Sequence, residues 1–164
     1  MTGEAIWEAQ GKCPELVLFP PDFPKYLYFS KRARQIYADY TDQVEQFGLD
    51  ECWLDVSGSV GLFGNGLMIA QEISSRIKAE LGITVSIGVS WNKIFAKLGS
   101  DYKKPDAITV FDHENYHDLV WPLPIGDLLY VGPATKRKLH NMAVFTIGDL
   151  ARADLRYTCL LYTS

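Results

Sequence analysis

The chain has 164 residues, enough for one domain or slightly more, and 48% of them are hydrophobic, which excludes a disordered protein. The 16 basic and 20 acidic residues give a net charge of -4, which by overall charge disfavours a nucleic-acid-binding protein. No apolar run could span a membrane and no signal peptide is present, so we expect a cytoplasmic protein without a membrane partner. The 3 cysteines match neither a disulfide framework nor a zinc site.

The N-terminal part is predicted to hold two helices with a short strand between them. The first helix covers residues 3–10 and ends before Pro14, and the consecutive apolar residues 16–19 predict a strand over 15–19. Three prolines indicate a loop over 20–24. The second helix is predicted over 26–40, where apolar side chains recur at helical spacing.

The rest of the chain is organised around residues 47–55, Phe-Gly-Leu-Asp-Glu-Cys-Trp-Leu-Asp. Strand-like alternation on both sides, and the bend that Gly48 permits, predict a β-hairpin with Asp50 and Glu51 at its turn. Neighbouring side chains on a regular strand point to opposite faces, so these carboxylates can converge only at a strand end or turn. Two adjacent like charges suggest a bound cation, whereas a solvent-exposed turn is the ordinary alternative.

Helices and strands alternate over the next sixty residues. A Gly/Ser-rich turn is predicted over 57–61. The regular elements that follow are a helix over 65–81, a strand over 84–90, a helix over 92–102 and a strand over 108–111. This order predicts an α/β or α+β fold in which helices cover one face of a sheet.

The helix over 92–102 and the residues just after it carry one polar stripe. Lys93, Lys97, Asp101 and Lys104 follow one another at spacings of four, four and three residues. Lysines near the two carboxylates could neutralise a triphosphate. The alternative is a solvated helix face, which is the commoner setting for a row of lysines.

After a proline-bracketed linker at residues 121–124, short helices are predicted over 125–129, 134–141 and 147–153, and we place a domain boundary near Trp121.

Gly132 opens the middle one of these helices, and its N-terminal N–H groups suit a phosphate. Lys136 and its basic neighbours add charge for sequence-independent contact with a nucleic-acid backbone. A helical hairpin that packs as a simple cap is the alternative.

His113-Glu114-Asn-Tyr-His117 matches the H-E-x-x-H pattern of zinc hydrolases, which makes such an enzyme a rival interpretation. No third ligand follows at the required spacing, and Pro122 ends any helix soon after His117. We therefore interpret this match as accidental.

Three motifs follow one another along the chain: the Asp50-Glu51 hairpin, the stretch over residues 86–105, and the Gly132 hairpin. The 86–105 stretch contains the segments Asn-Lys-x-x-Ala-Lys and Ser-Asp-x-x-Lys-Pro. Together and in this order, they resemble the Y-family of translesion DNA polymerases. Within that family the chain is most similar to the bacterial DNA polymerase IV type. The resemblance covers nearly everything from Gly3 to about Ala153. It implies an α+β palm over residues 1–120 and a small helical thumb with a helix-hairpin-helix over 121–155.

The resemblance also implies the roles of individual residues. Asp50 resembles a Mg²⁺ ligand, Glu51 the neighbouring catalytic carboxylate and Lys104 the lysine that contacts the incoming triphosphate. Gly132, Thr135 and Lys136 belong to the hairpin that holds DNA. The implied partners are primer-template DNA, deoxynucleoside triphosphates and, through regions beyond this chain, a sliding clamp.

Three departures from the family pattern stand out. The sequence does not contain the family's first palm strand, which carries a metal-binding Asp and lies near the aromatic residue that excludes ribonucleotides. The little-finger domain that grips DNA in this family is not found either. Residues 156–164 look like a non-native tail. We therefore expect an internal fragment of a longer polymerase that is inactive as this chain alone. A DNA-binding module without catalysis is the remaining alternative.

Overall fold

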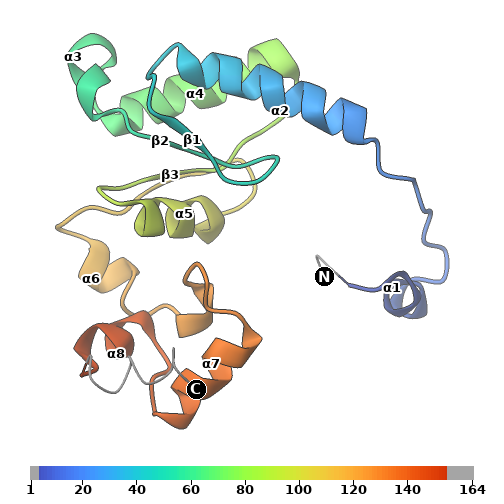
Figure 1. Ribbon diagram of the computed structural model, residues 1–164, viewed down its shortest axis with the longest axis vertical. Helices are drawn as coiled ribbons and strands as arrows, with labels where there is room; N and C mark the ends of the chain where they lie inside the picture. Colours follow the sequence, from blue (N-terminus) through green and yellow to red (C-terminus); the bar gives the residue numbers. More distant parts are fainter. Residues whose placement is uncertain (1–3, 155–164) are drawn as a thin grey trace.

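The computed structural model describes residues 4–154; the predicted tail at 156–164 lies outside the described residues. The chain forms a mixed fold of helices and small sheets (Figure 1). The α-helices are α1 (Ile6–Lys12), α2 (Phe23–Ala38), α3 (Val60–Phe63), α4 (Gly66–Leu81), α5 (Lys93–Tyr102), α6 (Tyr116–Leu119), α7 (Pro133–Asn141) and α8 (Ile147–Arg152). The strands and 3₁₀ turns are β1 (Val44–Gln46), β2 (Cys52–Leu54), β3 (Ile87–Val89), β4 (Ile108–Val110), η1 (Ser57–Ser59) and η2 (Ile125–Asp127).

The strands form two separate two-stranded sheets. β1 and β2 pair antiparallel as the predicted hairpin, with Val44 opposite Leu54. β3 and β4 pair parallel, with Ile87 opposite Ile108, because α5 supplies the crossover that a parallel pair requires. β2 and β3 are not hydrogen-bonded to each other, so each keeps one edge without a strand partner among residues 4–154.

The long helix α4 forms as its sequence predicts. The Asn65 side chain caps it by accepting a 3.0 Å hydrogen bond from the Met68 N–H, and Gly82 ends it in the left-handed conformation at φ 66°. The isoleucines spaced four residues apart face inward and are buried.

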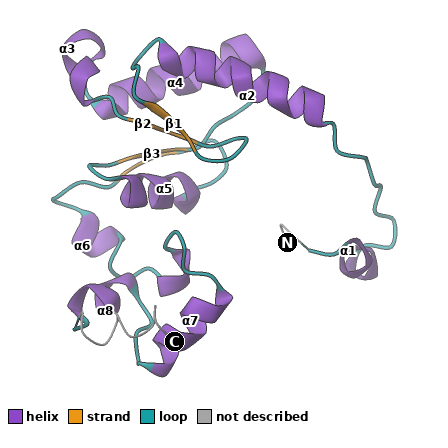
Figure 2. Ribbon diagram, in the orientation of Figure 1, coloured by secondary structure: helices purple, strands orange, loops and turns teal. Residues whose placement is uncertain are grey.

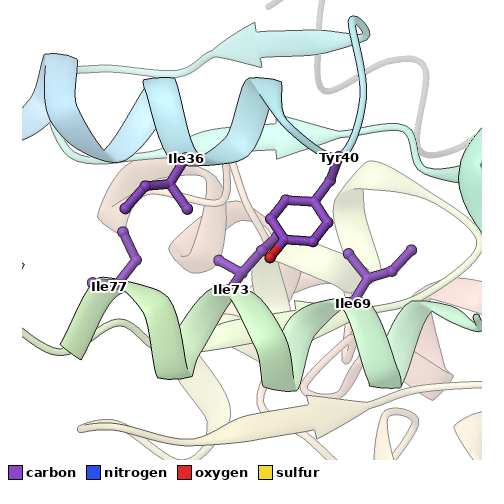
Figure 3. Packing of buried hydrophobic residues seen from close by; sticks show 5 residues of the cluster. All are labelled: Ile36, Tyr40, Ile69, Ile73 and Ile77. Atoms are coloured by element: carbon purple, nitrogen blue, oxygen red, sulfur yellow. The ribbon is translucent and has the colours of Figure 1, made fainter. Parts of the chain in front are cut away.

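The largest hydrophobic cluster lies between α2 and α4. Figure 3 shows Ile36 and Tyr40 from α2 and its C-terminal end facing Ile69, Ile73 and Ile77 of α4. Apolar side chains of β2 and β3 pack against this cluster, which places both strands beneath the helix pair.

The expectation that helices cover only one face of the sheet is wrong for β3. Side chains alternate along a strand, so Ile87 and Val89 point towards α4 while the position of Gly88 faces α5. A Cβ at Gly88 would lie 1.8 Å from the Ala96 carbonyl oxygen, so only glycine allows α5 to pack this closely. Figure 2 shows β3 between α4 and α5.

Four further predictions about local structure are corrected. Residues 15–19 form no strand, because no other strand among residues 4–154 pairs with them and their side chains stay exposed. α2 already begins at Phe23, since Pro24 fits the first helical turn, where no N–H is needed. Residues 57–63 form η1 and α3 rather than a turn, and the strand predicted over 84–90 is confined to β3.

The C-terminal helices share a core with the preceding part of the chain. Ile147 of α8 packs with Leu98 of α5, Phe111 and Val120. A third cluster, built on Ile125, lies between η2, α7 and α8. Among the described helices, none has both the length and the apolar character needed to cross a membrane.

Candidate active site

The loop between β1 and β2 carries the two adjacent carboxylates. The Phe47 N–H donates a 2.8 Å hydrogen bond to the Glu51 carbonyl oxygen, which closes the loop. Gly48 turns the chain at φ 83°, a conformation that glycine adopts without strain. The Ser30 hydroxyl of α2 donates to the Leu49 carbonyl oxygen and ties the loop to the helix. Asp50 and Glu51 therefore lie at the hairpin turn, as the sequence predicts.

The two carboxylates differ in their surroundings. Asp50 is exposed, and within residues 4–154 its carboxylate accepts no hydrogen bond and forms no ion pair. Glu51 is half-buried, and its Oε1 accepts a 2.7 Å hydrogen bond from the Lys97 ammonium group of α5. One carboxylate is thus free to bind a cation, while the other already has a cationic neighbour.

An alternating row of charges runs from Glu51 along α5. Lys97 also donates a 2.6 Å hydrogen bond to Asp101 Oδ2, and Lys104 lies 2.5 Å from Asp101 Oδ1. Burial works against the charged form of Lys97, but its bonds to Asp101 and Glu51 raise its pKa above the ordinary value. Burial likewise opposes ionisation of Asp101, whose pKa the two lysines nevertheless lower. Lys97 and Asp101 are therefore both held in their charged forms.

The polar stripe of α5 faces the hairpin instead of standing free in solvent. Lys93 pairs with Glu45 on β1, one helical turn before Lys97 pairs with Glu51. The Lys93 carbonyl oxygen also accepts a 3.1 Å hydrogen bond from the Trp53 indole N–H. These contacts fix α5 against the hairpin. A solvated helix face is the wrong interpretation for Lys97, whereas Lys93 stays exposed in its ion pair.

A groove of about 800 Å³ separates the two sheets and is lined by residues of both β2 and β3. Asp50, Glu51 and Lys104 all line this groove. Arg34 of α2 lines it as well, and its buried Nη1 has no hydrogen-bond partner in the described part of the chain. The structure therefore brings the two predicted carboxylates and the predicted triphosphate-binding lysine to one place.

The groove offers oxygen donors of the kind that a hard divalent cation prefers. Asp50 supplies both carboxylate oxygens, and Glu51 supplies the oxygen that Lys97 does not contact. Among residues 4–154, no group of three or more possible metal ligands is found. The donors fit Mg²⁺ in chemical type, but two carboxylates alone leave most of its coordination positions to water or substrate.

The predicted DNA-binding residues lie away from the groove, at the start of α7. Gly132 is the N-cap, and Thr135 and Lys136 are exposed in the first helical turns. The Lys136 stem lies over Gly126 of η2, where an added Cβ would come within 2.9 Å of the lysine Cδ.

The H-E-x-x-H residues do not form a zinc-hydrolase helix. His113 precedes α6 and stacks on Trp91 with ring centroids 4.0 Å apart, whereas His117 lies in α6 and contacts Trp121 at 3.9 Å. Each imidazole packs on a different indole, and α6 has only 4 residues, so the two rings do not share one helical face.

Comparison with known proteins decides the family. A sequence model of the impB/mucB/samB family matches residues 1–101, which include the whole hairpin and most of α5. The chain belongs to the impB/mucB/samB family. This membership confirms the resemblance to Y-family polymerases that the motifs predict.

Relatives of this impB/mucB/samB member are named DNA polymerase IV. The one from Acetivibrio thermocellus is 64% identical over 156 residues, and the one from Moorella thermoacetica is 41% identical over 150 residues. The matches cover 95% and 92% of this chain but only 39% and 38% of the relatives, so the chain spans about two fifths of their length.

Solved structures of similar proteins share the fold. An insertion ternary complex of Dbh DNA polymerase superposes with a TM-score of 0.85 at 29% identity, covering 95% of this chain and 46% of that one. The crystal structure of DinB from Sulfolobus solfataricus gives a TM-score of 0.84 at 29% identity, with the same coverage.

Two contacts in this impB/mucB/samB member were not predicted from its sequence. The ion pair between Lys97 and Glu51 joins residues 46 positions apart. The sequence shows only that Lys97 shares a helical stripe with Asp101, which does not identify Glu51 as a partner. The contact between Tyr130 and Phe47, at 6.5 Å between ring centroids, had no signal in either segment.

Proposed function

We propose that the chain is the catalytic part of a Y-family DNA-directed DNA polymerase that transfers a deoxynucleotide to a primer 3′-hydroxyl in translesion synthesis and DNA repair. The observation that carries this proposal is that Asp50, Glu51 and Lys104 line one groove. In this proposal residues 1–120 are a palm that lacks its first strand, and 121–155 are a thumb with a helix-hairpin-helix.

Asp50 and Glu51 would hold divalent cations, for which we propose Mg²⁺. When bound, this ion lowers the pKa of the attacking hydroxyl and stabilises the leaving pyrophosphate. The carboxylates themselves orient the reacting groups, and the Gly48 turn lets two neighbouring side chains act together.

Lys104 would neutralise the incoming triphosphate. Its ammonium group is half-exposed and is held at 2.5 Å by Asp101, from which it can turn to a phosphate oxygen. Lys97 would not contact the triphosphate, because its side chain is only 16% exposed and is bound to both Asp101 and Glu51. Asp101 thus holds Lys104 at the groove until nucleotide arrives.

The start of α7 would contact the DNA backbone. Gly132 has no side chain to block the first N–H groups of the helix, and Thr135 and Lys136 stand beside them. Neither Lys136 nor Arg137 forms an ion pair with a carboxylate within the described part of the chain, so both charges are available to phosphates. Such contacts are independent of sequence and weaken with salt.

The groove between β2 and β3 would receive an additional strand that carries a third carboxylate. Within residues 4–154 both strands present an unpaired edge, and Arg34 has an unpartnered nitrogen that a strand could satisfy. With Asp50 and Glu51 alone we expect weak Mg²⁺ binding and no polymerisation by this chain. Clamp binding stays a prediction.

Primer extension tests the proposal. The 164-residue chain is compared with a version extended at its N-terminus by the first strand and connecting helices of a DNA polymerase IV relative, with Mg²⁺, a primer-template and four deoxynucleoside triphosphates. We expect templated extension only from the extended version, with loss of activity in Asp50→Ala and a raised nucleotide KM in Lys104→Ala.

Two results would contradict the proposal. Extension by the unextended chain that Asp50→Ala abolishes would show that no third carboxylate is needed. DNA binding without any extension by the restored protein would favour a DNA-binding module without catalysis.

A further inference from the structure

Tyr130 occupies a backbone conformation that disfavours its side chain. The Val131 N–H donates a 3.0 Å hydrogen bond to the Leu128 carbonyl oxygen, which closes a four-residue turn. Tyr130 is the third residue of this turn and has φ 69°, a value that this position requires in a type II turn and that glycine adopts without strain. A bulky residue with positive φ is a true outlier. Nothing in the local backbone therefore explains a tyrosine here.

The phenol ring gains little from packing. Tyr130 is 73% exposed, and its one ring contact within residues 4–154 is an edge-on approach to Phe47 at 6.5 Å between centroids. Backbone strain and an exposed aromatic ring both work against folding. Strained residues of this kind gather at ligand-binding sites, so the outlier points to a role in binding.

The position of the ring indicates what it binds. Tyr130 stands two residues before the Gly132 cap of α7, where the proposed function places DNA phosphates. Its ring touches Phe47, three positions before Asp50, where the same proposal places the end of the primer. Tyr130 thus adjoins the cap of α7 in the chain and the hairpin in space.

A row of aromatic rings continues from this point along the hairpin. Phe47 packs on Trp53 with centroids 4.6 Å apart, and the Lys93 ammonium lies 5.5 Å from the Trp53 ring centroid. Lys136 and Arg137 follow Tyr130 in the chain and are exposed in the first turns of α7. Tyr130 is exposed, whereas Phe47 and Trp53 are half-buried. An accessible aromatic ring near cationic side chains is a surface that nucleic-acid strands use for sequence-independent contact.

We propose that Tyr130 is a DNA-contacting residue whose ring packs on the sugars of the strand held between α7 and the hairpin turn. This inference rests on the proposed function. In this inference the tyrosine ring positions the DNA strand and is not needed for folding. A role in DNA binding also explains why a strained residue is present at this turn.

The test uses the 164-residue chain and a fluorescein-labelled primer-template duplex, with anisotropy measured at low salt. Tyr130→Gly removes the ring and relieves the backbone, so Tm should rise while the Kd for DNA increases about three- to tenfold. Tyr130→Phe keeps the ring and should bind within about twofold of the unchanged chain.

Ala143→Gly is the matched control, because Ala143 also has positive φ, at 60°, but follows the opposite end of α7. Its Tm should rise and its Kd should stay unchanged. A Kd for Tyr130→Gly equal to that of the unchanged chain would overturn the inference alone, and so would equal weakening by Tyr130→Phe. Absence of DNA binding by the unchanged chain would instead overturn the proposed function together with the inference.

Discussion

Lys97 donates a 2.7 Å hydrogen bond to Oε1 of Glu51, a residue 46 positions earlier in the chain. The ammonium group thereby neutralises one of the two carboxylates at the hairpin turn. It also limits the attraction of this turn for a divalent cation, because a positive charge already stands beside the ligands. Lys97 thus acts as the resident counter-ion of the proposed metal site.

Replacing Lys97 with methionine should therefore tighten cation binding. Removing one charge at about 5 Å from a divalent ion is worth roughly 1.7 kcal/mol in water, or about fifteenfold in the Kd, at low ionic strength. Mn²⁺ binding to the 164-residue chain, measured by electron paramagnetic resonance of the free ion, checks this. Lys93→Met is the control and should leave the Kd unchanged, because Lys93 pairs with Glu45. Unchanged or weaker binding in Lys97→Met would refute the counter-ion role.

Phe111 should be a principal contributor to stability. Its side chain is 0% exposed in the cluster that joins α5, β4 and α8. Phe111→Ala should lower the free energy of unfolding by about 3–5 kcal/mol, measured by urea titration. Phe19→Ala, at a position 85% exposed, should change it by less than about 0.5 kcal/mol. Similar losses in the two variants would show that the C-terminal helices do not share this core.

Gly88 should not tolerate a side chain. An added Cβ would overlap the Ala96 carbonyl oxygen and approach the Ser100 nitrogen at 2.6 Å, so α5 would have to move away from β3. We expect Gly88→Ala to lose about 1–3 kcal/mol or more in thermal or urea unfolding. Gly58→Ala serves as the comparison, because no heavy atom lies within 4 Å of its added Cβ. Native stability of Gly88→Ala would disprove the close packing of α5 on β3.

Asp149 should make the start of α8 sensitive to acid. Hydrogen bonds from the Thr146 backbone and hydroxyl, and from the Phe145 N–H, lower the pKa of Asp149 from 3.8 to about 2. A lowered pKa in the folded state means that the stabilisation is complete above the unfolded value of 3.8 and is lost as pH falls through about 2. Thermal unfolding followed by circular dichroism from pH 6 to pH 2 measures this loss.

Asp149→Asn cannot ionise, so its Tm should fall less steeply over this interval than that of the unchanged chain, although it starts lower at pH 6. Parallel curves for the two proteins would show that the capping carboxylate does not contribute to the acid sensitivity.

The sequence by itself determined the elements that depend on short-range interactions. Asn65 and Gly82 fix the ends of α4, and Asn92 caps α5, because caps act through hydrogen bonds within a few residues. Gly48 and the alternation around it fix the hairpin. Three sequence motifs in one order, of which the Asp50-Glu51 motif is the first, were sufficient to indicate the family.

Tertiary structure alone decided which distant groups meet. Residues 15–19 have the apolar composition of a strand but form none, because a strand needs a partner's hydrogen bonds. The placement of α5 against the face of β3 opposite α4 depends on the space at Gly88, and only that packing brings Lys97 to Glu51. Composition and periodicity carry no record of such contacts, because they are set by how whole elements pack and not by neighbours in the chain.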